Sequence, residues 1–408
     1  MFLEILLFVL LGIVLGFFTG LAPGIHPNTI FAFTLSLSFL FIGFPIQAIL
    51  AFVVSLAVSN TFFDFIPSIF FGAPEEDSAI SVLPGHRMLL KGRGYEAIFL
   101  TAMGGLGVTF LTVMSLPFLF VLLPSIYFAI KPVIHIILIA AVLWMVWMER
   151  GTKKRLAAAS IFLASGIFGF ITLNSLPSDG ALFPALTGLF GLSTILTSIM
   201  EKTRIPPQKI QSEVHGNWLK GSLAGWMAGM ISGLLPGLGS SQAGIIAAQA
   251  LKAKMKEFLI ALGGINTSNM FFTFIVFYLL GKTRSGAVWM ISQIMDQFTV
   301  QDMGILVVVG VITALVSAVA TIKAARLLLG FMRKLNYTKT MIITACVLSF
   351  MIVALSGPLG VMISVTGTFL GLLAVSTGIK RTNLMGFLIL PTILYFSGFN
   401  PFFSGILW

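Results

Sequence analysis

The segment Gly20-Leu-Ala-Pro-Gly-Ile-His-Pro-Asn-Thr29 lies in a largely apolar stretch, and a related segment, Gly233-Leu-Leu-Pro-Gly-Leu-Gly-Ser-Ser-Gln242, follows 213 positions later. A second motif repeats in the same order. Ser59-Asn-Thr-Phe-Phe-Asp-Phe-Ile66 returns as Ser268-Asn-Met-Phe-Phe-Thr-Phe-Ile275, 209 positions later. Two motifs in the same order and at nearly the same offset indicate an internal duplication rather than chance similarity between apolar stretches. We therefore expect two related halves.

One long polar stretch marks the boundary between the halves. Glu201 to Lys220 is rich in charged and polar residues and contains Pro206-Pro207, as linkers often do. The sequence thus predicts a first repeat at residues 1–200, a linker at residues 201–220 and a second repeat at residues 221–408.

The composition predicts the environment of both halves. Of the 408 residues, 58% are hydrophobic and 9% are charged, and the mean hydropathy is +1.06. Soluble domains carry roughly 25% charged residues, so a soluble globule is excluded. Apolar runs such as Ala97–Leu123 are long enough to cross a membrane as helices and lack strand-like alternation. We predict an all-α polytopic membrane protein in which each half has a Gly/Pro-broken helical hairpin and about five further spans, or about twelve to fourteen membrane segments in total.

The basic residues predict how the halves are oriented. The net charge is +11, and the bases lie mainly in short loops, which is typical of cytoplasmic loops and argues against nucleic acid as a partner. Shifted by 209 positions, the basic cluster Arg87–Arg93 falls on the acidic stretch Met295–Asp302, and Lys252–Lys256 falls on uncharged Gly43–Gln47. This is the pattern of inverted-topology repeats. We expect both termini outside the cytoplasm and the linker inside it.

A Pro-Gly pair interrupts each half near its start. Non-helical backbone at membrane depth persists where it is buried in protein or lines a wet cavity, and paired breaks in inverted halves point to a transporter's substrate site. The positive end of the half-helix after each break favours an anion. The predicted substrate-binding residues are Pro23, Gly24, Asn28, Thr29, Asn60, Pro236, Gly237, Ser240, Ser241, Gln242 and Asn269. Alternatively, the breaks are packed helix kinks, and the two asparagines are interhelical hydrogen-bonding residues.

Asp64 is the one carboxylate well inside an apolar run, where a charge costs at least about 2.5 kcal/mol unless it is paired, solvated or protonated. With Asn60 and Ser59 it forms a candidate coupling-ion site, which would hold Na⁺ through oxygen ligands or H⁺ on the carboxylate alone. The alternative is an aspartate that bonds a broken helix end and does not titrate. No other cofactor is expected, because Cys346 and four scattered histidines offer no metal-binding cluster.

Several motifs of this sequence resemble those of a known family. Gly20–Thr29, Leu83–Met88 with Lys91–Gly94, Gly188–Leu192 and Gly233–Ala243 are similar to landmarks of the TctA family, the large membrane subunit of tripartite tricarboxylate transporters. The resemblance covers most of the chain in the right order. It implies ion-driven uptake of carboxylates such as citrate, with a small membrane subunit and an extracytoplasmic binding protein as partners.

These observations favour a secondary active transporter, an ion-coupled symporter that carries di- or tricarboxylates across the plasma membrane by alternating access. Two alternatives stay open. An intramembrane enzyme acting on a lipid-like substrate would need a catalytic constellation that Asp64 alone does not provide. A passive anion channel fits paired breaks less well than alternating access does. We therefore expect no enzymatic activity, and the absence of a phosphate-binding Gly-rich motif ending in Lys-Ser or Lys-Thr argues against ATP hydrolysis.

Overall fold

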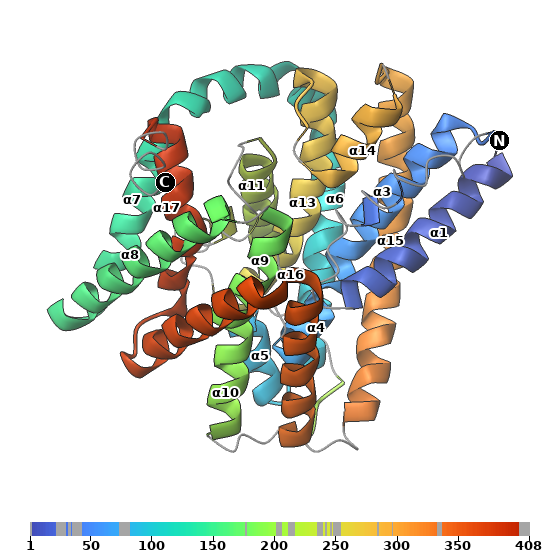
Figure 1. Ribbon diagram of the computed structural model, residues 1–408. Coiled ribbons are helices and arrows are strands. Elements are labelled where there is room, and N and C mark those ends of the chain that lie inside the picture. The colour runs from blue at the N-terminus through green and yellow to red at the C-terminus, as the bar shows by residue number, and fades with distance from the viewer. Residues whose placement is uncertain are drawn as a thin grey trace.

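The computed structural model describes residues 2–21, 30–31, 34, 43–72, 82–175, 178–200, 206–210, 217–234, 240, 243–244, 247, 254–283, 285–295, 297–332 and 337–399. These residues form helices and no strands (Figure 1). The helices of the first half are α1 (Phe2–Leu21), α3 (Ile46–Phe63), α4 (Phe65–Phe71), α5 (Val82–Leu90), α6 (Gly94–Ile130), η3 (Lys131–Val133), α7 (Ile134–Trp147), α8 (Thr152–Ser175), α9 (Ser178–Leu186), η4 (Thr187–Leu192) and α10 (Ser193–Met200). Those of the second half are α11 (Trp218–Leu234), α13 (Met255–Leu280), α14 (Gly286–Ile294), α15 (Val300–Met332), α16 (Tyr337–Ser376), η5 (Arg381–Met385) and α17 (Gly386–Ser397).

Seven helical segments of the described ranges are long and apolar enough to cross a membrane. They are Phe2–Leu21, Ile46–Phe71, Gly94–Trp147, Thr152–Asn174, Met255–Leu280, Val300–Gly330 and Met341–Ser376. The predicted all-α, multi-pass membrane architecture is therefore confirmed. The segment Gly94–Trp147 has 54 residues, which at about 1.5 Å per residue is far longer than one crossing. Figure 1 shows it rising as α6, bending across the top and descending as α7. The expected total of about twelve to fourteen segments stays a prediction.

Glycines bring α1 against α3 and α11 against α13 in the same way. A Cβ atom on Gly20 would lie 2.7 Å from the Cβ atom of Phe63, and one on Gly233 would lie 2.6 Å from the Cβ atom of Phe272. Such short distances are possible only for glycine, whose missing side chain lets two helices approach closely. The contact occurs at equivalent positions of the repeated motifs. The duplicated sequence thus carries duplicated packing.

A hydrogen bond repeats along with these contacts. The Ser59 hydroxyl donates to the carbonyl of Ile13 at 3.1 Å, and the Ser268 hydroxyl donates to the carbonyl of Trp226 at 3.2 Å. Ser59 and Ser268 occupy the same place in the second repeated motif, and the two acceptors are 213 positions apart. In each pair of helices, the two residues joined by this hydrogen bond come earlier in the sequence of their helices than the two residues at the glycine contact. Hence α1 is parallel to α3, and α11 is parallel to α13.

Helices of the two halves pack directly on one another. The long helix α6 of the first half lies along α13, and α15 of the second half lies along α3. At the α6–α13 contact, Cβ atoms on Gly104 and Gly263 would overlap the carbonyls of Ile260 and Thr101, so backbone meets backbone. Association in a membrane depends on such close packing, because lipid supplies no hydrophobic driving force between helices.

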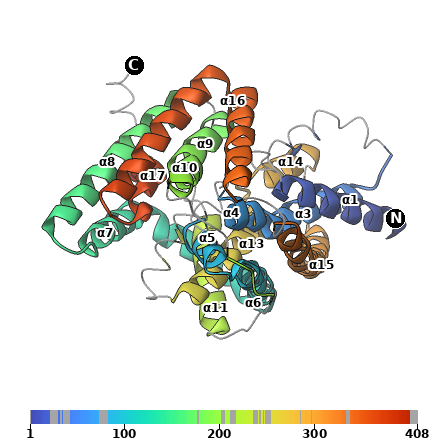
Figure 2. The same cartoon turned by 90° about the horizontal axis from the view of Figure 1, so that it is seen from below.

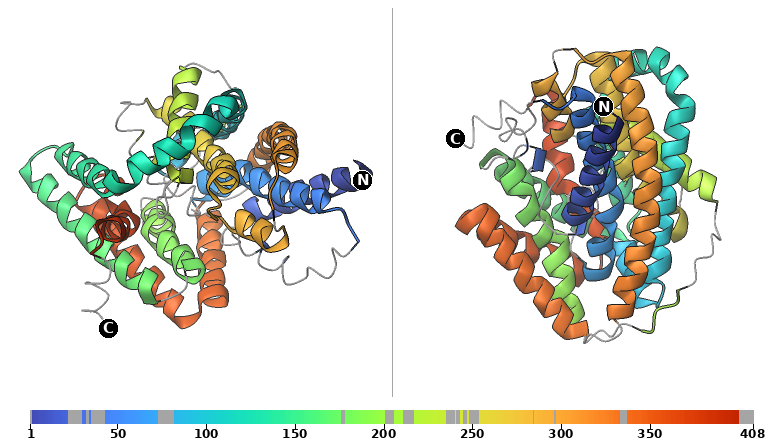
Figure 3. Two further views of the ribbon diagram at one scale, coloured as in Figure 1. Left: turned by 90° about the horizontal axis from the view of Figure 1, so that it is seen from above. Right: turned by 90° about the vertical axis from the view of Figure 1, so that its right-hand side faces the viewer.

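The helices gather into two groups that lie side by side when the molecule is seen from below (Figure 2) or from above (Figure 3, left). One group contains α1, α3–α6, α11 and α13–α15, and the other contains α7–α10, α16 and α17. Each group takes helices from both halves. In the second group α17 packs on α8, where the Cβ of a residue at Gly166 would lie 2.5 Å from Leu390, and α16 packs on η4.

The helix α16 bends sharply where Gly357 and Pro358 stand. Gly357 has φ 61° and ψ −160°, a conformation outside the helical region that glycine adopts without a steric penalty. Pro358 then removes a backbone donor at the same place. Figure 1 shows the result as two arms, one along α10 and one reaching toward the turn between α7 and α8. The second arm packs on α9 and η4 and brings the end of α16 to the turn between α7 and α8.

Candidate functional site

Most of the predicted break residues lie outside the described residues. These are Pro23, Gly24, Asn28, Thr29, Pro236, Gly237, Ser241 and Gln242. Ser240 is described, and its side chain is 1% exposed. Its hydroxyl has no hydrogen-bond partner among the described residues. The site can therefore be built from Ser240 and from the polar residues of α3, α13 and their neighbours.

Asp64 lies at the junction of α3 and α4 and is 1% exposed. Its backbone N–H donates to the carbonyl of Asn60 at 3.1 Å, which closes the last turn of α3. Pro67 follows three positions later and has no N–H to continue the helical ladder. The side chain of Asp64 thus projects from the junction of α3 and α4, inside the single apolar span Ile46–Phe71.

The side-chain partner of Asp64 comes from the other half of the chain. The Asn266 amide donates to carboxylate atom Oδ2 of Asp64 at 2.6 Å, and Asn266 is itself 2% exposed. A hydrogen bond to a charged group in a dry environment is stronger than one between neutral groups. Asn266 is not among the site residues predicted from the sequence. The available signal was a polar amide two residues before the repeated Ser268-Asn269 motif.

A second hydrogen bond joins α3 and α13 beside the first. The hydroxyls of Thr61 and Thr267 are 3.0 Å apart, and both side chains are buried. Thr61 and Asp64 are three positions apart, so they share one face of α3. Both bonds lie where α3 and α13 cross, and Figure 1 shows α3 descending toward α4 and α13 rising toward α14, so the two helices run in opposite directions.

Asn60 and Ser59 face a different neighbour. The Asn60 amide donates to the Thr19 hydroxyl at 3.2 Å, and the Ser59 hydroxyl donates to α1 as described above. Both residues therefore bind α1, whereas Asp64 binds α13. The three predicted coupling-ion residues are thus close in sequence, but Ser59 and Asn60 lie at the interface with α1 and Asp64 lies at the interface with α13.

The second half lacks an acidic counterpart of Asp64. Thr273 occupies the equivalent position, and its hydroxyl donates to the carbonyl of Met270 at 2.8 Å within its own helix. Asn269, the counterpart of Asn60, is half-buried on α13. The described part of the chain has no group of three His, Cys, Asp or Glu side chains that could hold a metal ion. Any cation at Asp64 would rely on hydroxyl, amide and carbonyl oxygens.

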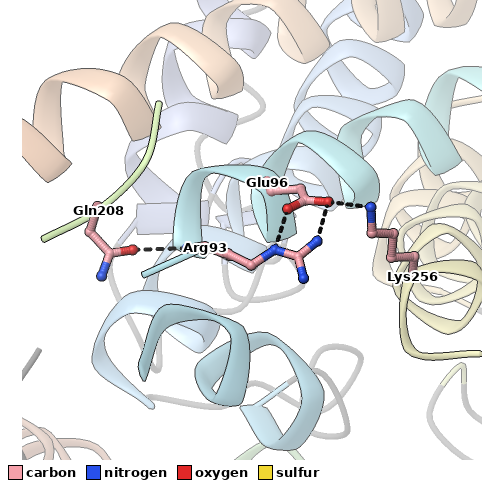
Figure 4. A network of polar contacts seen from close by, with 5 residues as sticks. Arg93, Glu96, Gln208 and Lys256 are labelled. Carbon is pink, nitrogen blue, oxygen red and sulfur yellow. Dashed lines mark hydrogen bonds and ion pairs between the residues drawn. The ribbon is translucent and has the colours of Figure 1, made fainter. Parts of the chain in front are cut away.

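An ion-pair network holds the two halves together at the end where α6 and α13 begin (Figure 4). Glu96, 5% exposed, accepts hydrogen bonds of 2.6 and 2.7 Å from the Arg93 guanidinium and lies 2.8 Å from the Lys256 ammonium. Lys220 of α11 approaches Glu257 at 3.4 Å beside it. These bases lie at helix starts that the charge pattern assigns to the cytoplasm in both halves.

The linker takes part in the same network. The side-chain oxygen of Gln208 accepts a hydrogen bond from the Gly94 backbone N–H at 2.9 Å, and its amide donates to the carbonyl of Leu89 at 2.8 Å. The backbone N–H of Lys209 donates to the carbonyl of Gly92 at 2.8 Å. Residues 206–210 of the linker are thus fixed on the turn between α5 and α6, where Gly92 has a positive φ of 75°.

His86 belongs to α5, the helix that precedes this turn, and lies outside the seven apolar spans. Its ring is 4% exposed, and Nδ1 lies 3.0 Å from the carbonyl of Ile69. Burial lowers the pKa of His86 below its ordinary value, and the positive charge of Arg381 acts in the same direction, against the hydrogen bond to Ile69. The imidazole is accordingly held in its neutral form.

Known proteins that are similar in sequence identify the family of this chain. The family model described as the tripartite tricarboxylate transporter TctA family matches residues 6–386. The chain belongs to the TctA family. An uncharacterized protein of Methanocaldococcus jannaschii is 32% identical over 390 residues, which cover 91% of this chain and 94% of that protein. No solved structure matches.

Membership of the TctA family confirms the resemblance that the sequence motifs carry and assigns the chain to membrane transport. Members of this family are components of tripartite transport systems, so the chain is expected to work with partner proteins. The family landmark Gly188–Leu192 corresponds to η4, a π-helical turn against which α16 packs. π-helical turns are rare in proteins overall, and those that occur are often found at functional sites.

Proposed function

We propose that this TctA-family protein is an ion-coupled secondary transporter of organic anions, with di- or tricarboxylates as the substrate class. The observation that carries the proposal is the buried Asp64 carboxylate hydrogen-bonded to Asn266 across the contact of the two halves. A membrane protein that only needed packing would gain nothing from a carboxylate there, because its burial is costly.

Asp64 is suited to couple an ion to movement between the halves. Binding of Na⁺ or H⁺ changes the charge on the carboxylate, and with it the strength of the hydrogen bond from Asn266. Since Asn266 belongs to α13 and Asp64 to the α3–α4 junction, the ion would alter the energy of a contact between halves. Such a contact can bias an alternating-access equilibrium.

We further propose that the two halves are inverted copies. Three observations support this. The glycine contacts and the serine hydrogen bonds repeat at equivalent positions, the equivalent helices α3 and α13 cross in opposite directions, and the basic beginnings of α6 and α13 meet in one ion-pair network. Paired Pro-Gly breaks would then lie on opposite sides of a common substrate site, which accepts the carboxylates through half-helix N-termini.

The tripartite family also suggests the partners and location. We propose that the chain works in the plasma membrane with a small membrane subunit and an extracytoplasmic binding protein that delivers the carboxylate. Co-purification of a tagged chain with such subunits from native membranes would support this part. Full transport by the chain alone in liposomes would contradict the need for them.

Uptake by proteoliposomes that contain the chain together with its co-purified subunits tests the central proposal. Radiolabelled citrate and succinate are offered under an imposed Na⁺ gradient, an imposed proton gradient, or neither. An ion-coupled transporter accumulates unchanged substrate above the external concentration only with one of the gradients. A passive channel equilibrates substrate without accumulation, and an enzyme alters it chemically, so chromatography of the internal contents distinguishes all three.

A further inference from the structure

The turn between α7 and α8 concentrates positive charge. Within six positions it holds four bases, which we call the α7–α8 basic turn: Arg150, Lys153, Lys154 and Arg155. The carboxylate of the same turn, Glu149, is 6% exposed. It accepts hydrogen bonds from the Lys380 backbone N–H at 2.9 Å and from the Asn383 amide at 3.2 Å. The one acidic group therefore faces the protein, and the bases are left outside.

These bases have no acidic partners, in contrast to those at the start of α6 and α13. The ion pairs among the described residues include those of Arg93, Lys220 and Lys256, and none includes a member of the α7–α8 basic turn. Three of its bases also lie in the first turn of α8. That end of a helix carries partial positive charge, so an arrangement of bases there is unfavourable unless an anion is nearby.

The second half extends the positive surface. The ammonium nitrogen of Lys154 would lie 3.6 Å from a Cβ atom at Gly378, so it reaches the turn that connects α16 to η5. Lys380 of that turn is exposed. Figure 1 shows the α7–α8 turn and the end of α16 close together at the lower left of the molecule. Five bases from two segments far apart in sequence thus converge on one place.

Apolar side chains adjoin the bases on the side of the membrane spans. Trp147 is 68% exposed and Leu156 is 65% exposed. The guanidinium of Arg155 lies 5.7 Å from the ring centroid of Trp147, and its Nε donates to the carbonyl of Glu149 at 3.1 Å. A tryptophan next to bases at a helix end is typical of the boundary between hydrocarbon and headgroups.

From this geometry we propose that the α7–α8 basic turn binds the phosphate of an anionic membrane lipid. The bases contact the phosphate oxygens, and the exposed surface of Trp147 and Leu156 contacts the acyl chains. Unpaired bases select a negative charge, and the adjoining apolar surface selects a lipid over free phosphate. The site is independent of the substrate and of the coupling ion proposed above.

Native mass spectrometry of the detergent-purified protein tests the proposal. The protein is titrated with phosphatidylglycerol, with phosphatidylcholine or with inorganic phosphate. We expect phosphatidylglycerol to bind in preference to the other two. The variant K153Q/K154Q removes two charges and should weaken its binding about tenfold or more, whereas K153R/K154R, which keeps them, should bind normally.

The matched control is K323Q/R326Q. It also removes two exposed bases, and these lie in the C-terminal part of α15, away from the α7–α8 basic turn in sequence. It should bind phosphatidylglycerol like the wild type. An equal loss in this control would mean that net charge alone attracts the lipid. Equal binding of phosphatidylcholine, or displacement of phosphatidylglycerol by an equimolar amount of phosphate, would also overturn the proposal. Circular dichroism of each variant verifies that its helices are intact.

Discussion

The Asn266 amide donates a 2.6 Å hydrogen bond to the Asp64 carboxylate, and the two residues belong to different halves of the chain. Both are buried, at 2% and 1% exposure. The bond lies beside the Thr61–Thr267 hydroxyl pair, so the crossing of α3 and α13 is polar inside apolar surroundings. In the proposed coupling, a change of charge on Asp64 would act here on the contact between the two halves.

Replacing Asp64 by asparagine removes the titratable charge and keeps the shape of the side chain. We expect Asp64→Asn to lose gradient-driven accumulation while still exchanging substrate across the liposome membrane. The asparagine can still accept the hydrogen bond from Asn266, so the protein should remain folded. Uptake into proteoliposomes with and without an ion gradient checks this. Accumulation equal to wild type with the same ion dependence would exclude Asp64 from coupling.

Removing the partner has a different expected effect. Asn266→Leu leaves a buried carboxylate without its amide donor and should lower the free energy of unfolding by roughly 1.5–3 kcal/mol if Asp64 is charged. In the double variant with Asp64→Asn the loss should be smaller than the sum of the single losses, which a double-mutant cycle of thermal unfolding in detergent measures. Additive losses would show that the two side chains do not stabilise each other.

The sequence predicted the helical membrane fold because apolar composition and run length are decisive in lipid, and it located Asp64 because a carboxylate in an apolar run is conspicuous. It did not predict Asn266 as the partner. Pairing between α3 and α13 depends on how the halves pack, and the spacing of residues along one chain does not contain that information. The sharp bend of α16 was also missed, although Gly357-Pro358 carries a local signal for it.

The paired Pro-Gly breaks give a prediction about binding, although these residues lie outside the described ranges. Gly24→Val and Gly237→Val each add a β-branched side chain where the backbone is expected to approach the substrate. We expect both variants to lose carboxylate binding, measured by isothermal titration calorimetry, while their helical content by circular dichroism stays at the wild-type level. Normal affinity in both would mean that the breaks are helix kinks.

Neutral, buried His86 predicts that acid destabilises the protein. Burial, aided by the charge of Arg381, keeps the folded-state pKa below the ordinary value of about 6.5. As the pH falls through 6.5, the unfolded chain takes up a proton that the folded protein does not, so stability decreases toward low pH. His86→Asn keeps an N–H donor for Ile69 and should flatten the pH dependence of the melting temperature between pH 7.5 and 5. An unchanged slope would contradict this assignment.

Inversion of the halves predicts which loops react with a membrane-impermeant thiol reagent. The turn between α5 and α6 and the end of α16 should be labelled from the cytoplasm, and the segment before α15 from outside. Gly92 is a poor probe of the first, because its φ is 75° and a Cβ there would lie 2.8 Å from the carbonyl oxygen of Pro207. Gly378, also at positive φ, is unsuitable for the same conformational reason.

The exposed residues Lys91, Ser376 and Gln297 are better positions for single cysteines. The native Cys346 is exposed and must first be replaced by alanine. In right-side-out vesicles we expect Gln297→Cys to react at once, and Lys91→Cys and Ser376→Cys to react only after the membrane is permeabilised. Lys91 and Gln297 lie in the segments that follow the second repeated motif in the two halves, so labelling of both from the same side would contradict inverted topology.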